Sequence, residues 1–273
     1  MPTVMANGVD LYYEEHGSGP PLLLIPPTAW PGSVWDIELV PRLRGRFRTI
    51  AYDQRGIGRS SIVDAPYTTA LLAQDALALL HALDAAPAHV FGFSTGGQVA
   101  QVMALDEPAA VRSMVLGGSN ARGPGGGVPF ALAARLIEEG YGGDYWLRHL
   151  TDTDFPFSRA FRDAHPDTVR ALADAIDRRK PPLRTYLRHL IVRGEHDARG
   201  RLGDIRTPTL VLVGGEDRRR GEGTGSDHME SAHLLAREIP NAELIEVGRA
   251  HHLFAWEEPD ETARIVTEFF LRH

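Results

Sequence analysis

The sequence predicts an α/β fold with a mostly parallel central sheet, flanked by helices and interrupted by a helical insertion before the last two strands. Short apolar runs of strand character alternate with segments of helical period along most of the chain, a pattern typical of parallel sheets with helices on both faces. From Phe130 to about Arg201 the pattern is helical, and no clear strand interrupts it. The length of 273 residues fits one large domain or two small ones, so it does not decide the division by itself.

The strands are expected where apolar residues alternate or run continuously. Val9 to Glu15 alternates as a half-buried strand does, and Pro21 to Ile25 is a short apolar run bounded by Gly-Pro and Pro-Pro, as in a buried strand. The remaining strands are expected at Phe47–Tyr52, His89–Phe93, Val111–Leu116, Thr209–Val213 and Ala242–Val247.

The helices are expected where apolar residues recur every three or four positions. Thr69 to Leu83 carries such a stripe and is expected to cross over between two strands. The other core helices are expected from Val99 to Asp106, from Glu230 to Glu238 and from Asp260 to Leu271. Inside the insertion, helices are expected near residues 130–139, 143–150, 166–179 and 183–193.

Composition narrows the possible partners. The net charge of −7, with no basic helix or continuous basic stripe, argues against a nucleic-acid partner. Cysteine is absent, which excludes disulfides, thiol nucleophiles and thiolate metal sites. No run of apolar residues approaches membrane-spanning length, and the first residues lack the pattern of a signal peptide. We therefore expect a cytoplasmic protein with no membrane partner.

One segment points to chemistry: a strand followed by Gly92-Phe-Ser94-Thr-Gly96 and then a helix. Gly-x-Ser-x-Gly alone is a weak signal, and an ordinary glycine-rich turn is the alternative. Between a strand and a helix, however, the chain must reverse within a residue or two, which forces the serine into a strained turn and exposes its hydroxyl. Ser94 is therefore a candidate nucleophile.

A serine hydroxyl needs a base to take its proton and an acid to orient that base. Asp217 follows the strand Thr209–Val213, and His251 follows the strand Ala242–Val247, so both are expected at the edge of the sheet where Ser94 lies. The order serine, acid, histidine is that of one known triad arrangement.

With these residues the chain resembles the α/β-hydrolase superfamily over nearly its whole length. The matching segments are Leu22–Ile25, Asp53-x-Arg-Gly-x-Gly-x-Ser60, Gly92–Gly97, Val211–Asp217 and Gly248-x-x-His251. The resemblance implies that Ser94, Asp217 and His251 are nucleophile, acid and base. It also implies an α/β-hydrolase core of residues 1–120 and 206–273 and a helical lid of residues 121–205. Relatives that cleave carbon–halogen bonds or open epoxides carry Asp as nucleophile, so Ser94 makes both activities unexpected.

Two neighbours compete for triad roles. Glu216 adjoins Asp217, but the spacing after the strand favours the aspartate. His252 could replace His251, but the Gly248-x-x-His spacing favours His251, which leaves His252 as a packing residue beside the site. The segment from Asp53 to Ser60 is expected to be a structural turn, held by Asp53 and Arg55.

The chain departs from its apparent family where one oxyanion-hole donor is expected. Most relatives read His-Gly after the third strand, whereas this chain reads Ile25-Pro26-Pro27-Thr28. Proline has no amide hydrogen, so we expect the N–H groups of Thr28 and Thr95 to bind the oxyanion.

The aromatic residues suggest an apolar pocket for a small molecule. Candidate lining residues are Trp30, Tyr145, Trp146, Phe155 and His252, with Trp35 nearby.

Glu195-His-Asp197 and Asp227-His-Met-Glu230 lack a metal-site framework, so no metal and no cofactor is expected. The Arg218–Arg220 run is expected to be solvated and the Gly221–Ser226 segment to be a loop, and the sequence leaves open whether either contacts a ligand, as it does the oligomeric state.

Together these features predict a cofactor-free serine hydrolase that cleaves a small to medium, largely apolar ester or lactone through an acyl-enzyme. The alternatives are carbon–carbon bond hydrolysis of a β-diketone-type substrate, and cofactor-free lyase or oxygenase chemistry on the same scaffold. The alternative outside the enzymes is a ligand-binding receptor, because the same fold also serves proteins without catalytic activity.

Overall fold

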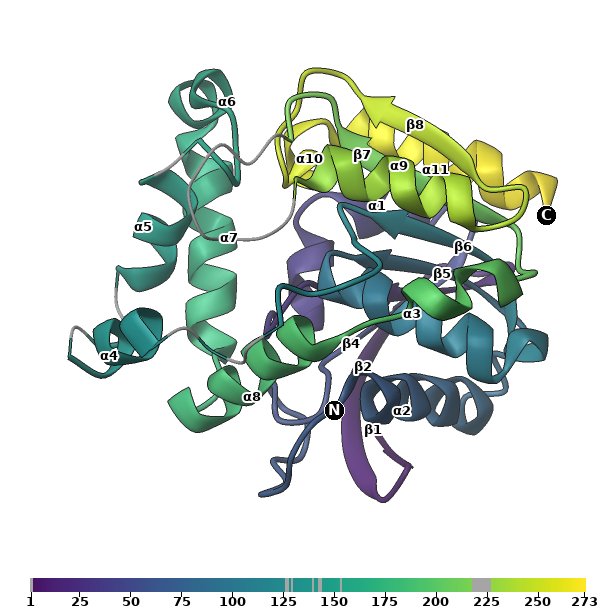
Figure 1. The fold of residues 1–273 in the computed structure, drawn as a ribbon, viewed down its shortest axis with the longest axis horizontal. Helices are drawn as coiled ribbons and strands as arrows, with labels where there is room; N and C mark the ends of the chain where they lie inside the picture. Colours follow the sequence, from purple (N-terminus) through teal and green to yellow (C-terminus); the bar gives the residue numbers. More distant parts are fainter. Residues whose placement is uncertain are drawn as a thin grey trace.

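The structure is a computed structural model that describes residues 2–125, 128, 130–138, 140–141, 144–152, 154–217 and 227–273. Its centre is an eight-stranded sheet with the strand order β1-β2-β4-β3-β5-β6-β7-β8 (Figure 1). The strand β2 pairs antiparallel with β1 and β4, and all other pairings are parallel. The strands are β1 (Thr3–Ala6), β2 (Val9–His16), β3 (Pro21–Ile25), β4 (Arg48–Tyr52), β5 (Ala88–Phe93), β6 (Val111–Gly117), β7 (Thr209–Gly214) and β8 (Glu243–Val247).

Helices cover both faces of the sheet, so the predicted fold class is confirmed. The core helices are α1 (Leu39–Leu43), α2 (Thr69–Ala82), α3 (Thr95–Asp106), α9 (His228–Glu238), α10 (Phe254–Glu257) and α11 (Pro259–Arg272). Every predicted strand is present, with ends that differ by one residue or none. The sequence did not predict β1, α1 or α10.

Alternation along the strands assigns each helix to a face. In β3, Leu22 and Leu24 belong to the apolar cluster that also holds residues of α1 and α11, whereas Leu23 and Ile25 belong to the cluster formed with α2, α3 and α9. Successive side chains of a strand point to opposite faces. A strand buried on both faces therefore reads as a continuous apolar run.

A run of helices separates β6 from β7. These are α4 (Phe130–Glu138), α5 (Tyr145–Thr151), α6 (Arg159–Ala164), α7 (Pro166–Arg179) and α8 (Leu183–Glu195). Figure 1 shows α4 to α7 grouped to one side of the sheet. The four helices expected here are present, and the six-residue α6 was not predicted. The chain segments on either side of these helices meet, because the N–H of Gly123 donates to His196 O and that of Ala198 to Ala121 O.

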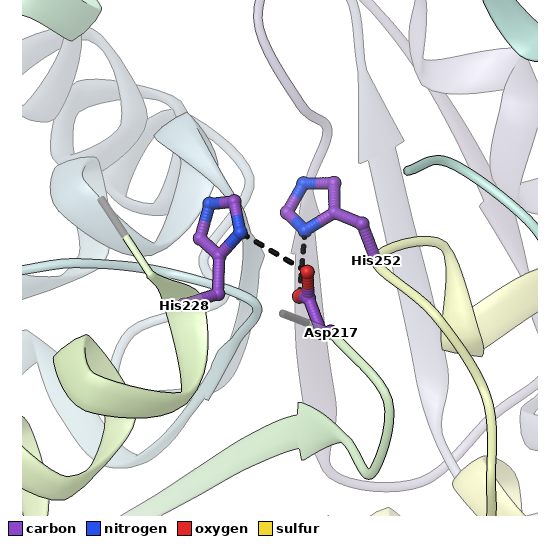
Figure 2. Close-up of side chains that lie close together, drawn as sticks. All are labelled: Asp217, His228 and His252. Atoms are coloured by element: carbon purple, nitrogen blue, oxygen red, sulfur yellow. Dashed lines mark hydrogen bonds and ion pairs between the residues drawn. The ribbon is translucent and has the colours of Figure 1, made fainter. Parts of the chain in front are cut away.

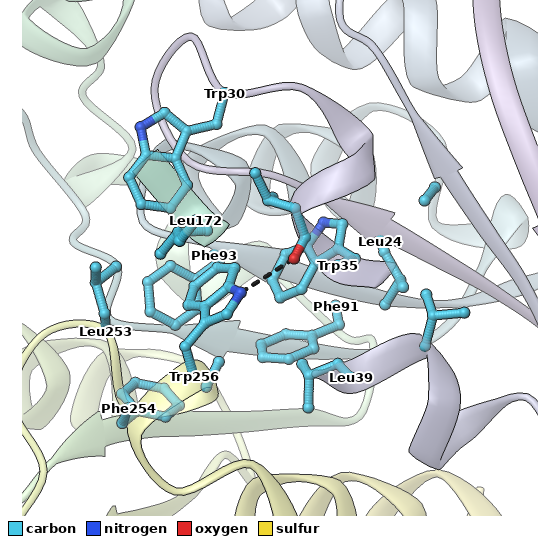
Figure 3. Packing of buried hydrophobic residues seen from close by; sticks show 14 of the residues in the cluster. Leu24, Trp30, Trp35, Leu39, Phe91, Phe93, Leu172, Leu253, Phe254 and Trp256 are labelled. Atoms are coloured by element: carbon cyan, nitrogen blue, oxygen red, sulfur yellow. Dashed lines mark hydrogen bonds between the residues drawn. The ribbon is translucent and has the colours of Figure 1, made fainter. Parts of the chain in front are cut away.

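Two of the four tryptophans, Trp35 and Trp256, pack in the core instead of lining a cavity. Trp35 stacks on Trp256 with ring centroids 5.0 Å apart, and the Nε1–H of Trp256 donates to Val34 O at 3.1 Å (Figure 3). Trp35 is fully buried and, among the described residues, belongs to this core and not to the lining of the cavity described below.

The turn after β4 is structural, as expected, although Asp53 and Arg55 do not pair with each other. Asp53 accepts the N–H of Gly32 at 2.8 Å and that of Arg59 at 2.9 Å. Arg55 instead pairs with Asp75 of α2 at 2.5 Å, with both side chains buried. No helix of the described chain combines the length and the apolar character needed to cross a membrane.

Candidate active site

Ser94 stands in the strained turn between β5 and α3. Its backbone has φ 54° and ψ −115°, a conformation rare for a residue with a side chain. The flanking glycines are required by space. A Cβ on Gly92 would lie 2.2 Å from Gly96 O, and one on Gly96 would lie 2.2 Å from Ile25 O. The close approach of β5, α3 and the end of β3 holds Ser94 at the sheet edge, where it lines a cavity.

Asp217 is the buried acid that follows β7, and Glu216 is not. The Asp217 side chain has no exposed surface and accepts hydrogen bonds from two histidines. The Glu216 carboxylate is about half exposed and pairs with Arg249 at 3.5 Å. The sequence-based preference for Asp217 over Glu216 therefore agrees with the side-chain geometry.

The histidine that meets Asp217 is His252, not His251. His252 Nδ1 lies 2.9 Å from Asp217 Oδ2 (Figure 2), and His252 lines the same cavity as Ser94. The backbone N–H of His251 donates to Glu257 at 3.0 Å, and no recorded hydrogen bond joins its ring to Asp217 within the described chain. Neighbouring residues of an extended segment point in different directions, and the turn that begins at Gly248 directs His252 inward. The prediction of His251 as the partner of Asp217 was wrong by one residue.

A second histidine, His228, shares the same carboxylate. It lies at the start of α9, and its Nδ1 is 3.1 Å from Asp217 Oδ1, so each carboxylate oxygen has its own imidazole (Figure 2). The two rings stack with centroids 4.3 Å apart, and Phe155 stacks on both. Sequence reasoning missed His228. The sequence feature that could have indicated it is its place directly after Asp227, which caps α9, in the segment that follows Asp217.

The ionisation of Asp217 is fixed by these partners. Burial acts to raise the pKa of its carboxyl group, but the charges and hydrogen bonds of His252 and His228 outweigh burial and hold that pKa well below its usual range. Asp217 is therefore an anion throughout the neutral range. It accepts the Nδ1–H of each ring, which leaves both Nε2 atoms on the far side of the rings.

Thr28 and Thr95 lie side by side at the cavity. Their hydroxyl oxygens are 2.5 Å apart, and both residues line the cavity that Ser94 lines. Within the described chain, neither backbone N–H donates to a protein acceptor. No described acceptor in the core engages the Thr28 amide, which leaves it available to an oxyanion.

The cavity has a volume of about 740 Å³ and is walled by both the core and the inserted helices. All five residues that the sequence predicts to line a pocket border this cavity: Trp30, Tyr145, Trp146, Phe155 and His252. Its described lining contains no Asp or Glu, but it includes Arg135 and Arg193. It is therefore less apolar than the aromatic residues suggested.

Arg193 of α8 is the most unusual charge in this lining. Burial lowers the pKa of its guanidinium group. No ion pair or side-chain hydrogen bond of Arg193 is found within the described chain; its carbonyl oxygen accepts from Gln98 at 3.3 Å. A guanidinium group carries five donors and remains charged in proteins, so a partly buried one for which the described residues offer no counter-charge is costly.

Two groups of acidic and imidazole side chains bring their ligand atoms within 4.8 Å of one another, so they could be considered for a metal: Asp217, His228 and His252, and the partly buried Glu14, His16 and Asp36. In the first group each Nδ1 is at hydrogen-bonding distance from a carboxylate oxygen, and a nitrogen that donates a proton cannot ligate a metal. The segments Arg218–Arg220 and Gly221–Ser226 lie outside the described residues.

Comparison with known proteins agrees with this architecture. The family model described as alpha/beta hydrolase fold matches residues 20–259. A protein of Azorhizobium caulinodans, provisionally named carbamate hydrolase RutD, is 28% identical over 263 residues, which are 95% of this chain and 94% of the relative. A 2-hydroxy-6-oxononadienedioate/2-hydroxy-6-oxononatrienedioate hydrolase of Paraburkholderia xenovorans is 27% identical over 96% of this chain and 90% of its own.

Among solved structures, the enol-lactonase from Burkholderia xenovorans LB400 superposes with a TM-score of 0.84 at 25% identity, covering 99% of this chain and 100% of that one. The family match extends over most of the sequence and includes the strand-turn-helix that carries Ser94. This chain therefore belongs to the family of enzymes with the alpha/beta hydrolase fold.

Proposed function

We propose that the protein is a serine hydrolase in which Ser94, His252 and Asp217 cleave an ester or lactone through an acyl-enzyme. The observation that carries the proposal is a single cavity lined by a serine on a strained turn and by a histidine bonded to a buried, ionised aspartate. Such a serine, base and acid are what nucleophilic attack on a carbonyl requires.

The proposed reaction begins with His252 Nε2 taking the proton of Ser94 Oγ while the oxygen attacks the carbonyl carbon. Asp217 holds the ring through Nδ1 and stabilises the imidazolium that forms. The amides of Thr28 and Thr95 donate to the oxyanion. His252 then returns the proton to the leaving oxygen, and a water molecule, deprotonated in its turn by His252, releases the acid from Ser94.

We also infer that residues 121–205 act as a lid. The cavity residues Tyr145, Trp146, Leu190 and Arg193 belong to the inserted helices, whereas Ser94 and His252 belong to the core. Shape and charge of the pocket are therefore set largely by the insertion. A small-molecule substrate and a cytoplasmic location remain predictions.

Arg193 supports a substrate that carries a carboxylate or a similar anion. Within the described chain, the guanidinium group of Arg193 forms no ion pair, and the described lining of the cavity contains no acidic side chain that could supply one. A carboxylate on the substrate would pair with the guanidinium in a geometry that suits both. The relative of Paraburkholderia xenovorans is named for a dioate, which is consistent with an acidic substrate.

The first test is labelling with a fluorophosphonate followed by peptide mass spectrometry. We expect the label on Ser94 and no label in the Ser94→Ala variant, because only an activated serine reacts. Absence of labelling in the wild-type protein would favour the receptor alternative. A panel of esters, lactones and β-diketones then separates the reactions, and turnover of the β-diketones alone would favour carbon–carbon hydrolysis.

Carbon–carbon hydrolysis is the second candidate because similar proteins include two hydrolases named for 2-hydroxy-6-oxononadienedioate, at 26% and 27% identity. Lyase or oxygenase chemistry has less support, since the Thr28 and Thr95 amides remain available for an oxyanion.

The anionic substrate is tested by replacing the guanidinium. For Arg193→Met we expect KM for an acid-bearing ester to rise by roughly tenfold to a hundredfold, because a charge-assisted hydrogen bond is lost, while KM for the matching neutral ester changes little. Arg188→Met is the matched control on the same helix, because Arg188 pairs with Asp64 instead of lining the cavity. Equal effects of Arg193→Met on both esters would contradict an anion-binding role.

A further inference from the structure

His228 is a buried imidazole that the proposed reaction does not use. It lies in the first turn of α9, borders the cavity, and faces Asp217 with Nδ1 at 3.1 Å. Figure 2 shows the His228 and His252 rings on the same side of the carboxylate, each with its second nitrogen turned away from it. The arrangement comprises two histidine–aspartate pairs that share one aspartate.

We propose that His228 is a positioning residue that divides the charge of Asp217 with His252 and so keeps His252 neutral, and active, at lower pH. This inference rests on the proposed role of His252 as the base. In this role His228 acts on the base through Asp217, without contact between its Nε2 atom and the substrate.

The argument is one of charge balance. Asp217 is a single negative charge, and one carboxylate compensates one imidazolium. A donor from His228 on Oδ1 leaves less of that charge to stabilise a proton on His252. If a proton does arrive at the pair, the two rings, stacked at 4.3 Å, compete for it, since two adjacent cations repel each other.

Among the described residues, the charge of Asp217 is shared by two imidazole rings. Asp217 follows β7, His252 follows β8 and His228 begins α9, while the insertion contributes the uncharged Phe155, which stacks on both rings. Nearby Glu257 of α10 is engaged by the backbone of His251. The N-terminus of α9 carries partial positive charge, which also opposes a cation on His228.

A purely structural role is the alternative: His228 would fill space under Phe155 and begin a helix. Two variants separate the roles. His228→Asn carries an amide nitrogen at the position of Nδ1 and so retains the donor to Asp217, without an ionisable ring. His228→Leu removes the donor and retains bulk. His233→Asn is the matched control, because His233 is an exposed residue of the same helix.

In His228→Leu the whole charge of Asp217 acts on His252, so we expect the acid limb of kcat/KM to move to higher pH by roughly 0.5 to 1 unit. His228→Asn is expected to restore the wild-type limb at least in part, and His233→Asn to leave it unchanged. An acid limb that stays in place in His228→Leu overturns the proposal, as does an equal shift in the leucine and asparagine variants.

A readout independent of turnover keeps the test separate from the proposed function. In ¹⁵N-histidine-labelled protein with Ser94→Ala, the titration midpoint of the His252 ring is followed with His228, Leu or Asn at position 228. We expect the midpoint to rise only with leucine. An unchanged midpoint overturns the inference about His228, whereas failure of the hydrolase assignment appears as a wild-type protein that does not turn over any ester or lactone.

Discussion

Ser94 combines a rare backbone conformation with a side chain that is needed only for chemistry. Its φ of 54° is imposed by the approach of Gly92, Gly96 and Ile25 and not by its hydroxyl group. We therefore expect Ser94→Ala to fold with an unchanged circular dichroism spectrum and a melting temperature within a few degrees of wild type. Turnover should fall by about a thousandfold or more, as for loss of a nucleophile that acts as part of a unit. Turnover within tenfold of the wild type would remove Ser94 from the mechanism.

The adjacent histidines provide a matched pair at the base position. Because His252 contacts Asp217 and His251 does not, His252→Ala should lower kcat by roughly a thousandfold or more, whereas His251→Ala should retain activity within a few-fold. Steady-state kinetics on one ester measures both. The opposite ranking would return the role of base to His251.

This pair also shows where sequence reasoning reached its limit at the residue scale. Ser94 and Asp217 were recognisable because each lies within three residues of the end of an apolar strand, where the sheet constrains its position. The histidine follows a turn whose length depends on Gly248, with φ +45°, and on the bond from Ala250 N–H to Val247 O. Neither feature can be read from the sequence, so the Gly248-x-x-His spacing selected the wrong one of two adjacent histidines. The pairing of His228 with Asp217 is a long-range contact with no local pattern.

At the scale of elements, prediction succeeded where burial imposes a period and failed where an element is short. The strands β3, β5 and β7 are apolar runs buried on both faces, and α7 was predicted with the ends that it has. The four-residue β1 and the six-residue α6 are too short for a period to emerge. In α6 no residue is fully buried, so its sequence lacks an apolar stripe.

The contact between the elbow and the end of β3 supports a prediction at this scale. In Gly96→Ala the new Cβ would lie 2.2 Å from Ile25 O and 2.9 Å from Pro26 O. Backbone must move, so we expect a loss of about 1–3 kcal/mol in the free energy of unfolding, and a fall in kcat because the Thr28 amide follows that segment directly. Urea unfolding and kinetics measure the two effects. Gly45→Ala, with no atom within 4 Å of its Cβ, is the control that should remain near wild type, and equal stability of both variants would show that the elbow tolerates a side chain.

At the scale of the whole molecule, the insertion and the core are joined close to the site. The N–H of Leu253 donates to Pro156 O at 2.8 Å, directly beside His252, and that of Gly58 donates to Arg179 O at 3.2 Å. His189 of α8 is fully buried against the core, and its Nε2–H donates to Arg55 O at 3.1 Å. A change in how the insertion is seated would therefore reach both the pocket and the loop that carries His252.

Two buried histidines at the contact between the insertion and the core are expected to make the stability of the folded protein depend on pH. Burial lowers the pKa of His189 and of His196 to about 4, whereas an unfolded histidine titrates near 6.5. Between these values the unfolded chain binds protons that the folded chain refuses, so the free energy of unfolding falls as the pH falls. Each histidine contributes up to about 1.4 kcal/mol per pH unit to this slope.

We therefore expect urea midpoints to decrease steadily from pH 6.5 to pH 4.5. In His189→Gln an amide nitrogen takes the place of Nε2 and can still donate to Arg55 O, but nothing titrates. The decrease should become shallower by up to about 1.4 kcal/mol per pH unit, even if the variant is less stable at pH 7. His233→Gln, an exposed substitution on α9, should leave the slope of the wild type. A slope in His189→Gln that matches the wild type would mean that the buried ring of α8 is not what makes the folded protein sensitive to acid.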